Sequence, residues 1–192
     1  TGELAPVSIG SYPLLGETEA RAALAAAVEA YGQGRGAWPT ASVRQRIEHV
    51  EEFLRLMILQ REPVVRLLMW EIGKTLGDAA REFDRTVDYV RETIAALKEL
   101  DRAGSRFAIE GGIIGQIRRA PFGVVLCLGP FNYPLNETFT TLIPALIMGN
   151  TVVFMPPKLG VLLHQPLLAA FAAAFPPGVV NTVYGDGPTV IT

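Results

Sequence analysis

The sequence predicts an α/β protein in which a layer of helices precedes the first βαβαβ part of a doubly wound parallel sheet. Two features support this fold class. The first half of the chain holds four segments of helical periodicity with no strand between them. The second half alternates short apolar runs with helical segments, which is typical of parallel strands joined by helical crossovers. We therefore divide the chain into a helical part (1–104), a β-hairpin extension (105–120) and the start of the sheet domain (121–192).

The helical part is defined by its periodicity and by its breakers. An alanine-rich segment with acidic residues in its first turn ends at the glycine-rich stretch Gly32–Gly36. Ser42 is an N-cap residue for the next helix, and Pro63 suits the first turn of the third. The four predicted helices are Glu17–Tyr31, Ser42 to about Gln60, Pro63 to about Gly73, and about Leu76 to Leu100.

Two charged motifs in this part have ordinary structural interpretations. Gly73-Lys74-Thr75 is similar to the end of a phosphate-binding P-loop, but Leu68 stands where the motif needs a glycine, and no strand precedes it. We therefore do not assign a P-loop. The charge-dense segment Arg81–Arg85 is by default a solvated helix face.

The sheet part begins after a hairpin. Ser105–Glu110 and Gly115–Arg119 are predicted to pair across Gly111-Gly112. Three strands then alternate with two helices. Because the first of these strands is apolar throughout, we expect it to be buried on both faces. The strands are Val124–Leu128, Asn150–Met155 and Val179–Tyr184, and the helices are Pro134–Met148 and Val161–Ala174.

The composition is that of a globular protein with ample material for a core. Of the 192 residues, 49% are apolar and 19% are charged, and the mean hydropathy is +0.29. These values exclude a disordered or collagen-like chain. The net charge of −2 gives no field that would recruit nucleic acid or an anionic membrane, so neither is an expected partner.

The expected location is the cytoplasm. The single cysteine excludes a disulfide framework and fits a reducing compartment. The start of the sequence has neither the basic residues nor the apolar run of a signal peptide. The most apolar stretch, Leu142–Met155, is interrupted by Pro144 and Gly149, so we expect no membrane span.

A site is expected where the parallel strands end, in the loops Gly129–Tyr133, Pro156–Gly160 and Gly185–Pro188. The usual glycine fingerprint for a pyrophosphate is missing there. Asn132 has two interpretations. Asparagine before a helix commonly caps backbone groups, but an amide at a strand end can also donate to a developing oxyanion.

An ordered series of motifs resembles the amino-terminal part of the aldehyde dehydrogenase family over nearly the whole chain. The series is Ala120-Pro121-Phe122-Gly123-Val124-Val125, Gly129-Pro130-Phe131-Asn132-Tyr133-Pro134-Leu135, Pro144-Ala145-Leu146, Gly149-Asn150 and Val152-Val153-Phe154. Phe131–Pro134 and Pro156-Pro157-Lys158 are most similar to the non-phosphorylating, NADP-linked glyceraldehyde-3-phosphate dehydrogenase branch. The resemblance implies an incomplete aldehyde dehydrogenase fold with a Rossmann-like, cofactor-binding sheet domain.

The resemblance also implies residue roles. Family members attack an aldehyde with a cysteine thiolate, pass a hydride to the nicotinamide, and release the acid with a glutamate-activated water. Asn132 would be the catalytic oxyanion donor, and Arg85 and Tyr133 would contact a phosphorylated substrate with it. No metal is required. The implied cofactor-binding residues are Leu128, Gly129, Pro130, Phe131, Met155, Pro157, Lys158, Gly187 and Thr192.

Two cofactor residues bear on affinity and on the choice of cofactor. Met155 stands where the family has a lysine that contacts the adenosine ribose and phosphate, so weaker binding is expected. Lys158 falls where NAD-preferring relatives tend to carry an acid. It therefore favours NADP, with NAD as the alternative.

The 192 residues hold half of an implied active site. Nothing in them matches the family's nucleophilic cysteine, its base glutamate or its glycine-serine-threonine turn. Cys127 lies within an apolar strand and is interpreted as a buried structural cysteine. The chain alone is therefore expected to be inactive.

Three functions remain open at this stage. The first is oxidation of D-glyceraldehyde 3-phosphate to 3-phosphoglycerate with NADP, in an enzyme that is a homo-oligomer when full length. The second is a dehydrogenase for another aldehyde. The third is a non-enzymatic, truncated or partner-binding remnant, whose cut sheet would leave apolar edges.

Overall fold

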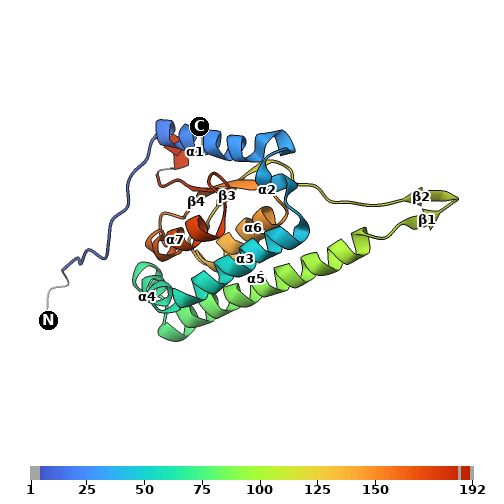
Figure 1. Cartoon of the computed structure of the whole chain (residues 1–192). Coiled ribbons are helices and arrows are strands. Elements are labelled where there is room, and N and C mark those ends of the chain that lie inside the picture. The colour runs from blue at the N-terminus through green and yellow to red at the C-terminus, as the bar shows by residue number, and fades with distance from the viewer. Residues whose placement is uncertain (1–4, 186, 191–192) are drawn as a thin grey trace.

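The computed structural model describes residues 5–185 and 187–190, and its elements form layers around a small parallel sheet (Figure 1). The helices are α1 (Glu17–Tyr31), η1 (Gly32–Gly34), α2 (Ala37–Thr40), α3 (Val43–Leu59), α4 (Arg61–Ile72), α5 (Leu76–Gly104), α6 (Asn136–Ile147), η2 (Leu162–His164), α7 (Gln165–Ala174) and α8 (Gly187–Val190). The strands are β1 (Ala108–Glu110), β2 (Ile113–Gly115), β3 (Val124–Leu128), β4 (Thr151–Met155) and β5 (Val180–Thr182).

The sheet confirms the predicted α/β class. Its three strands are parallel and lie in the order β3-β4-β5. Leu128 pairs with Met155, and Phe154 pairs with Thr182, so all three strands end at one edge. The crossovers α6 and α7 lie on the same face, as right-handed connections between sequential strands require.

The sequence analysis expected the helices of the first half to form one layer, but they form two. α3, α4 and α5 pack on α6, α7 and η2, whereas α1 packs on the opposite face of the sheet against β3, β4 and β5. The hydroxyl of Thr151 on β4 donates to the carbonyl of Ala27 on α1 at 2.8 Å. The difference arises because sequential crossovers occupy one face only, and α1 covers part of the other.

The burial predicted for β3 is wrong, because this strand lies at the edge of the described sheet. Cys127 is buried, but Leu126 and Leu128 are each about half exposed. β4 lies between its two neighbours and is buried from Thr151 to Phe154. A continuous apolar sequence therefore predicted the positions of both strands, but it did not predict how deeply each is buried.

The predicted hairpin forms, but both strands are shorter, and the second lies at Ile113–Gly115 instead of the predicted Gly115–Arg119. α5 continues to Gly104, four residues past its expected end, and only Ala108–Glu110 and Ile113–Gly115 pair. The hairpin projects away from the layers (Figure 1), and its isoleucines are exposed. Among the helices of the described residues, none is long and apolar enough to cross a membrane.

His164 is a fully buried titratable residue in the core between β4 and α6. Its Nε2 lies 3.1 Å from the carbonyl oxygen of Pro134, and its ring meets Phe154 edge-on. Its Nδ1 is buried without a hydrogen-bond partner among the described residues. Burial lowers the pKa of His164 from 6.5 to about 3, so the imidazole stays neutral in the folded protein.

We expect the protein to lose stability as the pH falls from about 6.5 towards 3. In this window the unfolded chain binds a proton at His164 that the folded protein excludes, so acid favours unfolding, by at most about 1.4 kcal/mol per pH unit. Thermal unfolding between about pH 7 and pH 5 should show a weaker pH dependence for His164→Gln than for the wild type. His49→Gln removes the other histidine and is the control. Equal slopes for His164→Gln and the wild type would contradict the assignment.

Candidate active site at the carboxyl edge of the sheet

The loop after β3 contacts the end of β4 closely. The amide of Gly129 donates to the carbonyl of Met155 at 3.1 Å. A Cβ at Gly129 would lie 2.5 Å from Cδ of Pro157 and 2.6 Å from the hydroxyl of Thr138. Only glycine fits there, because any side chain would prevent this close approach of the two loops.

The loop after β4 completes the contact. Pro157 is buried, the next residue Lys158 is exposed, and Gly160 has a φ of +94°. A Cβ at Gly160 would lie 2.5 Å from Cβ of Pro134, at the start of the α6 segment. The structure thus brings the predicted cofactor residues Leu128, Gly129, Met155 and Pro157 together.

The remaining predicted cofactor residues are more scattered. Pro130 is partly exposed, Phe131 is 64% exposed, and Gly187 begins α8 after β5. Lys158 lines a separate pocket with Trp70 and the segment 9–14. Thr192 lies outside the described residues.

The three predicted substrate residues line one pocket. Arg85 on α5 faces an open pocket of about 970 Å³ that Asn132 and Tyr133 also line. Arg85 is exposed and has no hydrogen bond or ion pair among residues 5–185 and 187–190, whereas Arg81 in the same pocket pairs with Asp78. A guanidinium without a protein partner is available to an anionic group in the pocket.

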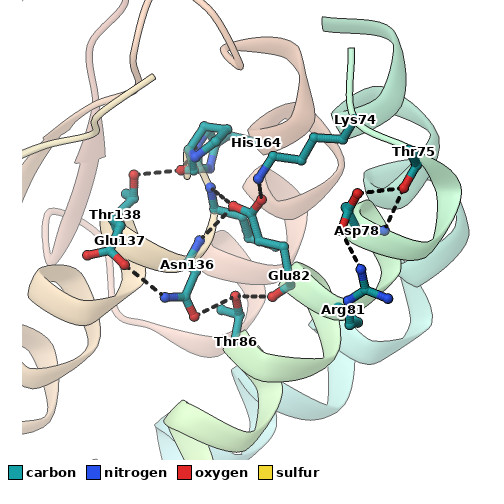
Figure 2. Close-up of polar contacts among 12 residues, drawn as sticks. Lys74, Thr75, Asp78, Arg81, Glu82, Thr86, Asn136, Glu137, Thr138 and His164 are labelled. Atoms are coloured by element: carbon teal, nitrogen blue, oxygen red, sulfur yellow. Dashed lines mark hydrogen bonds and ion pairs between the residues drawn. The ribbon is translucent and has the colours of Figure 1, made fainter. Parts of the chain in front are cut away.

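Asn132 does not cap the helix that follows it. Within the described part of the chain its side chain makes no hydrogen bond, and it lines the pocket instead. The N-terminus of α6 is satisfied by Glu82 of α5, whose Oε1 accepts from the amides of Leu135 and Asn136 at 3.0 and 3.2 Å (Figure 2). The capping interpretation of Asn132 is therefore not what the structure shows.

Glu82 also forms a buried ion pair. Its Oε2 pairs with Nζ of Lys74, and the two side chains are 1% and 13% exposed. The ammonium of Lys74 lies 4.0 Å from the ring centroid of Tyr133, within range of a cation–π interaction. The pair therefore joins α5 to the loop that carries Asn132.

The sequence analysis missed this pair, although both residues belong to motifs that it considered. Gly73-Lys74-Thr75 is a turn between helices, in which Gly73 ends α4 and Thr75 caps α5. In the segment Arg81–Arg85, Arg81 and Arg85 are exposed but Glu82 is buried. The available signal was spacing, because Glu82 falls on the stripe of α5 that buries Ala79, Phe83, Thr86, Val87 and Val90.

A second carboxylate acts similarly on the next crossover. Glu71 of α4 accepts from the amides of Leu162 and Leu163 at 2.9 and 2.8 Å, where η2 begins. Burial raises the pKa of Glu71, and the backbone donors oppose that rise. Both crossovers of the sheet are therefore held at their start by acids of the helical layer.

Cys127 is a buried structural cysteine, as the sequence analysis interpreted it. It is 1% exposed on β3, and burial raises the pKa of its thiol to about 11. A thiol in this environment is protonated near neutral pH and is a poor nucleophile. Among the described residues no group of three or more His, Cys, Asp or Glu side chains is arranged to hold a metal ion.

The fold and the pocket define a class of protein. A parallel βαβαβ unit with a pocket beside the carboxyl ends of its strands is typical of nucleotide-dependent α/β enzymes. Residues 5–192 match the sequence model of the Aldehyde dehydrogenase family. The chain belongs to this family, whose members are NAD(P)-dependent oxidoreductases.

Three comparisons describe the similarity. An NADP-dependent glyceraldehyde-3-phosphate dehydrogenase from Streptococcus equinus is 33% identical over 99% of this chain and 39% of its own length. Malonate-semialdehyde dehydrogenase 1 from Bacillus licheniformis is 36% identical over 88% of this chain and 35% of its own length. The solved structure of NADP-dependent glyceraldehyde-3-phosphate dehydrogenase from Bacillus halodurans, complexed with NADP, has a TM-score of 0.82 at 31% identity and covers 96% of this chain and 39% of its own. The chain thus spans less than half the length of these relatives.

We expect Cys127 to resist alkylation in the folded protein. The thiol is buried and its pKa is raised to about 11, so little thiolate is exposed to reagent. Labelling with iodoacetamide at about pH 8 should be at least about tenfold slower than in denaturant, as intact mass would report. Because this is the only cysteine of the 192 residues, the labelled mass identifies it. Rapid labelling without denaturant would show that β3 opens.

Proposed function

We propose that this chain is the amino-terminal part of an NADP-dependent aldehyde dehydrogenase that oxidises an anionic aldehyde, with D-glyceraldehyde 3-phosphate as the favoured substrate. The observation that carries the proposal is one pocket lined by Asn132, Tyr133 and Arg85, whose guanidinium has no ion pair among the described residues. A neutral donor and a cation in one pocket suit a substrate with a carbonyl at one end and an anion at the other.

Asn132 would act on the carbonyl end. When a cysteine thiolate adds to the aldehyde carbon, the carbonyl π electrons move to oxygen, and the amide of Asn132 donates to the resulting oxyanion. When the oxyanion re-forms the carbonyl, the C–H bond of the adduct breaks and its hydride leaves, which gives the thioester; a nicotinamide would supply the hydride acceptor. Water then hydrolyses the thioester with a glutamate as base. The cysteine and the glutamate of this scheme are not among the 192 residues, so the chain alone would not turn over.

Arg85 would act on the anionic end. The two relatives described above are named for glyceraldehyde 3-phosphate and for malonate semialdehyde, and each of these aldehydes carries an anionic group. A guanidinium can bind a phosphate or a carboxylate with two parallel hydrogen bonds. The malonate-semialdehyde relative keeps a carboxylated aldehyde open as the alternative substrate.

The cofactor proposal rests on the loops after β3 and β4. Leu128, Gly129, Met155 and Pro157 are in contact there, and the Bacillus halodurans structure with the same fold is complexed with NADP. Lys158 adds a positive charge that suits a 2′-phosphate, with NAD as the alternative cofactor.

A homo-oligomer is part of the proposal. The hairpin β1–β2 projects from the body (Figure 1) and exposes Ile109, Ile113 and Ile114 by two thirds or more. Exposed apolar side chains on a two-stranded ribbon favour a protein contact over solvent. The alternative, a partner-binding remnant without activity, would use the same surface.

The test of the function is a substrate comparison on a complete enzyme that carries these residues, and the intact mass of the sample is recorded. Arg85→Gln should lower kcat/KM about 10- to 100-fold for glyceraldehyde 3-phosphate and malonate semialdehyde, because charge-assisted hydrogen bonds are lost. Oxidation of propanal should stay within about twofold. Arg81→Gln, in the same pocket but paired with Asp78, is the control. Equal losses for charged and neutral aldehydes would reject the anion site, and a complete enzyme that oxidises no aldehyde would reject the dehydrogenase function.

We expect Met155→Lys to tighten NADP binding. A lysine at the end of β4 could donate a charge-assisted hydrogen bond that methionine cannot make, worth roughly 1.5–3 kcal/mol or about ten- to a hundredfold in affinity. Titration of NADP into a complete enzyme that carries these residues would measure it, with Met148→Lys, outside the two loops, as the control. Unchanged affinity in Met155→Lys would count against the assignment of this loop to the cofactor.

A further inference from the structure

We propose that Glu82, through its ion pair with Lys74, is a positioning residue that keeps the amide of Asn132 free for the substrate carbonyl. The inference rests on the proposed function of Asn132. The observation behind it is that the amides at the start of α6 are capped by a residue of another helix. Asn132, in the loop directly before α6, does not cap them.

Both oxygens of the Glu82 carboxylate are used. Oε1 accepts from the amides of Leu135 and Asn136, and Oε2 pairs with Lys74 (Figure 2). The side chain is only 1% exposed, so water cannot replace these contacts. A carboxylate at this place also meets the positive end of the α6 dipole. Glu82 therefore fixes the first turn of α6 against α5.

The residues beside Glu82's contacts are held as well. Tyr133 lies against the ammonium of Lys74, and the carbonyl of Pro134 contacts His164 at 3.1 Å and accepts from Thr138 at 2.6 Å. At the other end of the loop, Gly129 bonds to Met155. The segment 130–132 is thus fixed at both ends, and Asn132 lies one residue before the anchored part.

The spacing explains why the cap matters for Asn132. An N-cap side chain accepts from the backbone amide two or three residues later. Asn132 stands three residues before Leu135, so its amide oxygen is the local group able to replace Glu82 at that donor. With Glu82 present, the amides of Leu135 and Asn136 are satisfied and Asn132 remains in the pocket. Without Glu82, the unsatisfied donors would draw Asn132 into the cap and out of the pocket.

The test combines backbone exchange on the chain with steady-state kinetics on a complete enzyme that carries these residues. Glu82→Ala removes the acceptor and the charge, whereas Glu82→Gln keeps an acceptor oxygen but loses the ion pair. Glu99→Gln is the control, because Glu99 lies on the same helix, is exposed, and pairs with Arg102 away from this pocket. Lys74→Met removes only the cation and serves if Glu82→Ala does not fold.

In Glu82→Ala we expect hydrogen exchange at Leu135 and Asn136 to accelerate at least about tenfold. We also expect kcat to fall about 10- to 100-fold, with the KM values for aldehyde and NADP within about threefold, because the oxyanion contact is made only in the transition state. Glu82→Gln should recover part of both losses, Lys74→Met should show a smaller loss of kcat, and Glu99→Gln should match the wild type.

The outcomes separate this inference from the proposed function. If the wild type is active and Glu82→Ala keeps its kcat, or mainly raises KM, the positioning role is overturned and the proposed function stands. Unaltered exchange at Leu135 and Asn136 overturns the anchor itself. A complete wild-type enzyme that oxidises no aldehyde, although it supplies the cysteine and the glutamate, overturns the function, and the catalytic positioning falls with it even if exchange responds.

Discussion

The arrangement of this molecule depends on two carboxylates that the helical layer places at the start of the two crossovers. Glu82 of α5 satisfies the first turn of α6, and Glu71 of α4 satisfies the start of η2. The amides at a helix start have no partner within the helix, and when buried they cost free energy if left unmet. Meeting them from the outer layer fixes the crossovers, and so the loops before them, relative to α4 and α5.

Because the helical layer caps the crossovers, the loops before them can pack closely together without supplying the capping groups themselves. Gly129 approaches Pro157 too closely for any side chain, and Gly160 does the same with Pro134. A loop of this kind contributes little capping of its own, and Asn132 contributes none among the described residues. Acids of α4 and α5 accept the hydrogen bonds of the backbone amides, and the side chain of Asn132 stays in the pocket.

The sequence predicted the elements better than their environment. Local signals located α1 at Glu17–Tyr31 and β3 at Val124–Leu128, because alanine content, glycine breakers and apolar runs act within a few residues. The half-exposed face of β3 could not be predicted, since it depends on which strand lies at the edge and on how far α1 reaches. Glu82 was overlooked because its role joins positions that are 53 residues apart in the chain. Only its place in the apolar stripe of α5 gave a local hint.

Anion recognition by Arg85 has to work in a pocket where acids outnumber bases. The acids nearest to it in sequence are already paired: Asp84 with Arg61 through two bonds of 2.8 Å, and Asp88 with Arg91 at 3.1 Å. Such exposed pairs add little stability, at most about 1 kcal/mol each, but they neutralise the charges on either side of Arg85. Glu92, the acid of the pocket without a pair among the described residues, lies two helical turns away, roughly 10 Å along α5. At that separation salt screens most of its effect. The guanidinium therefore presents a local positive charge beside Asn132 although the pocket as a whole is acidic.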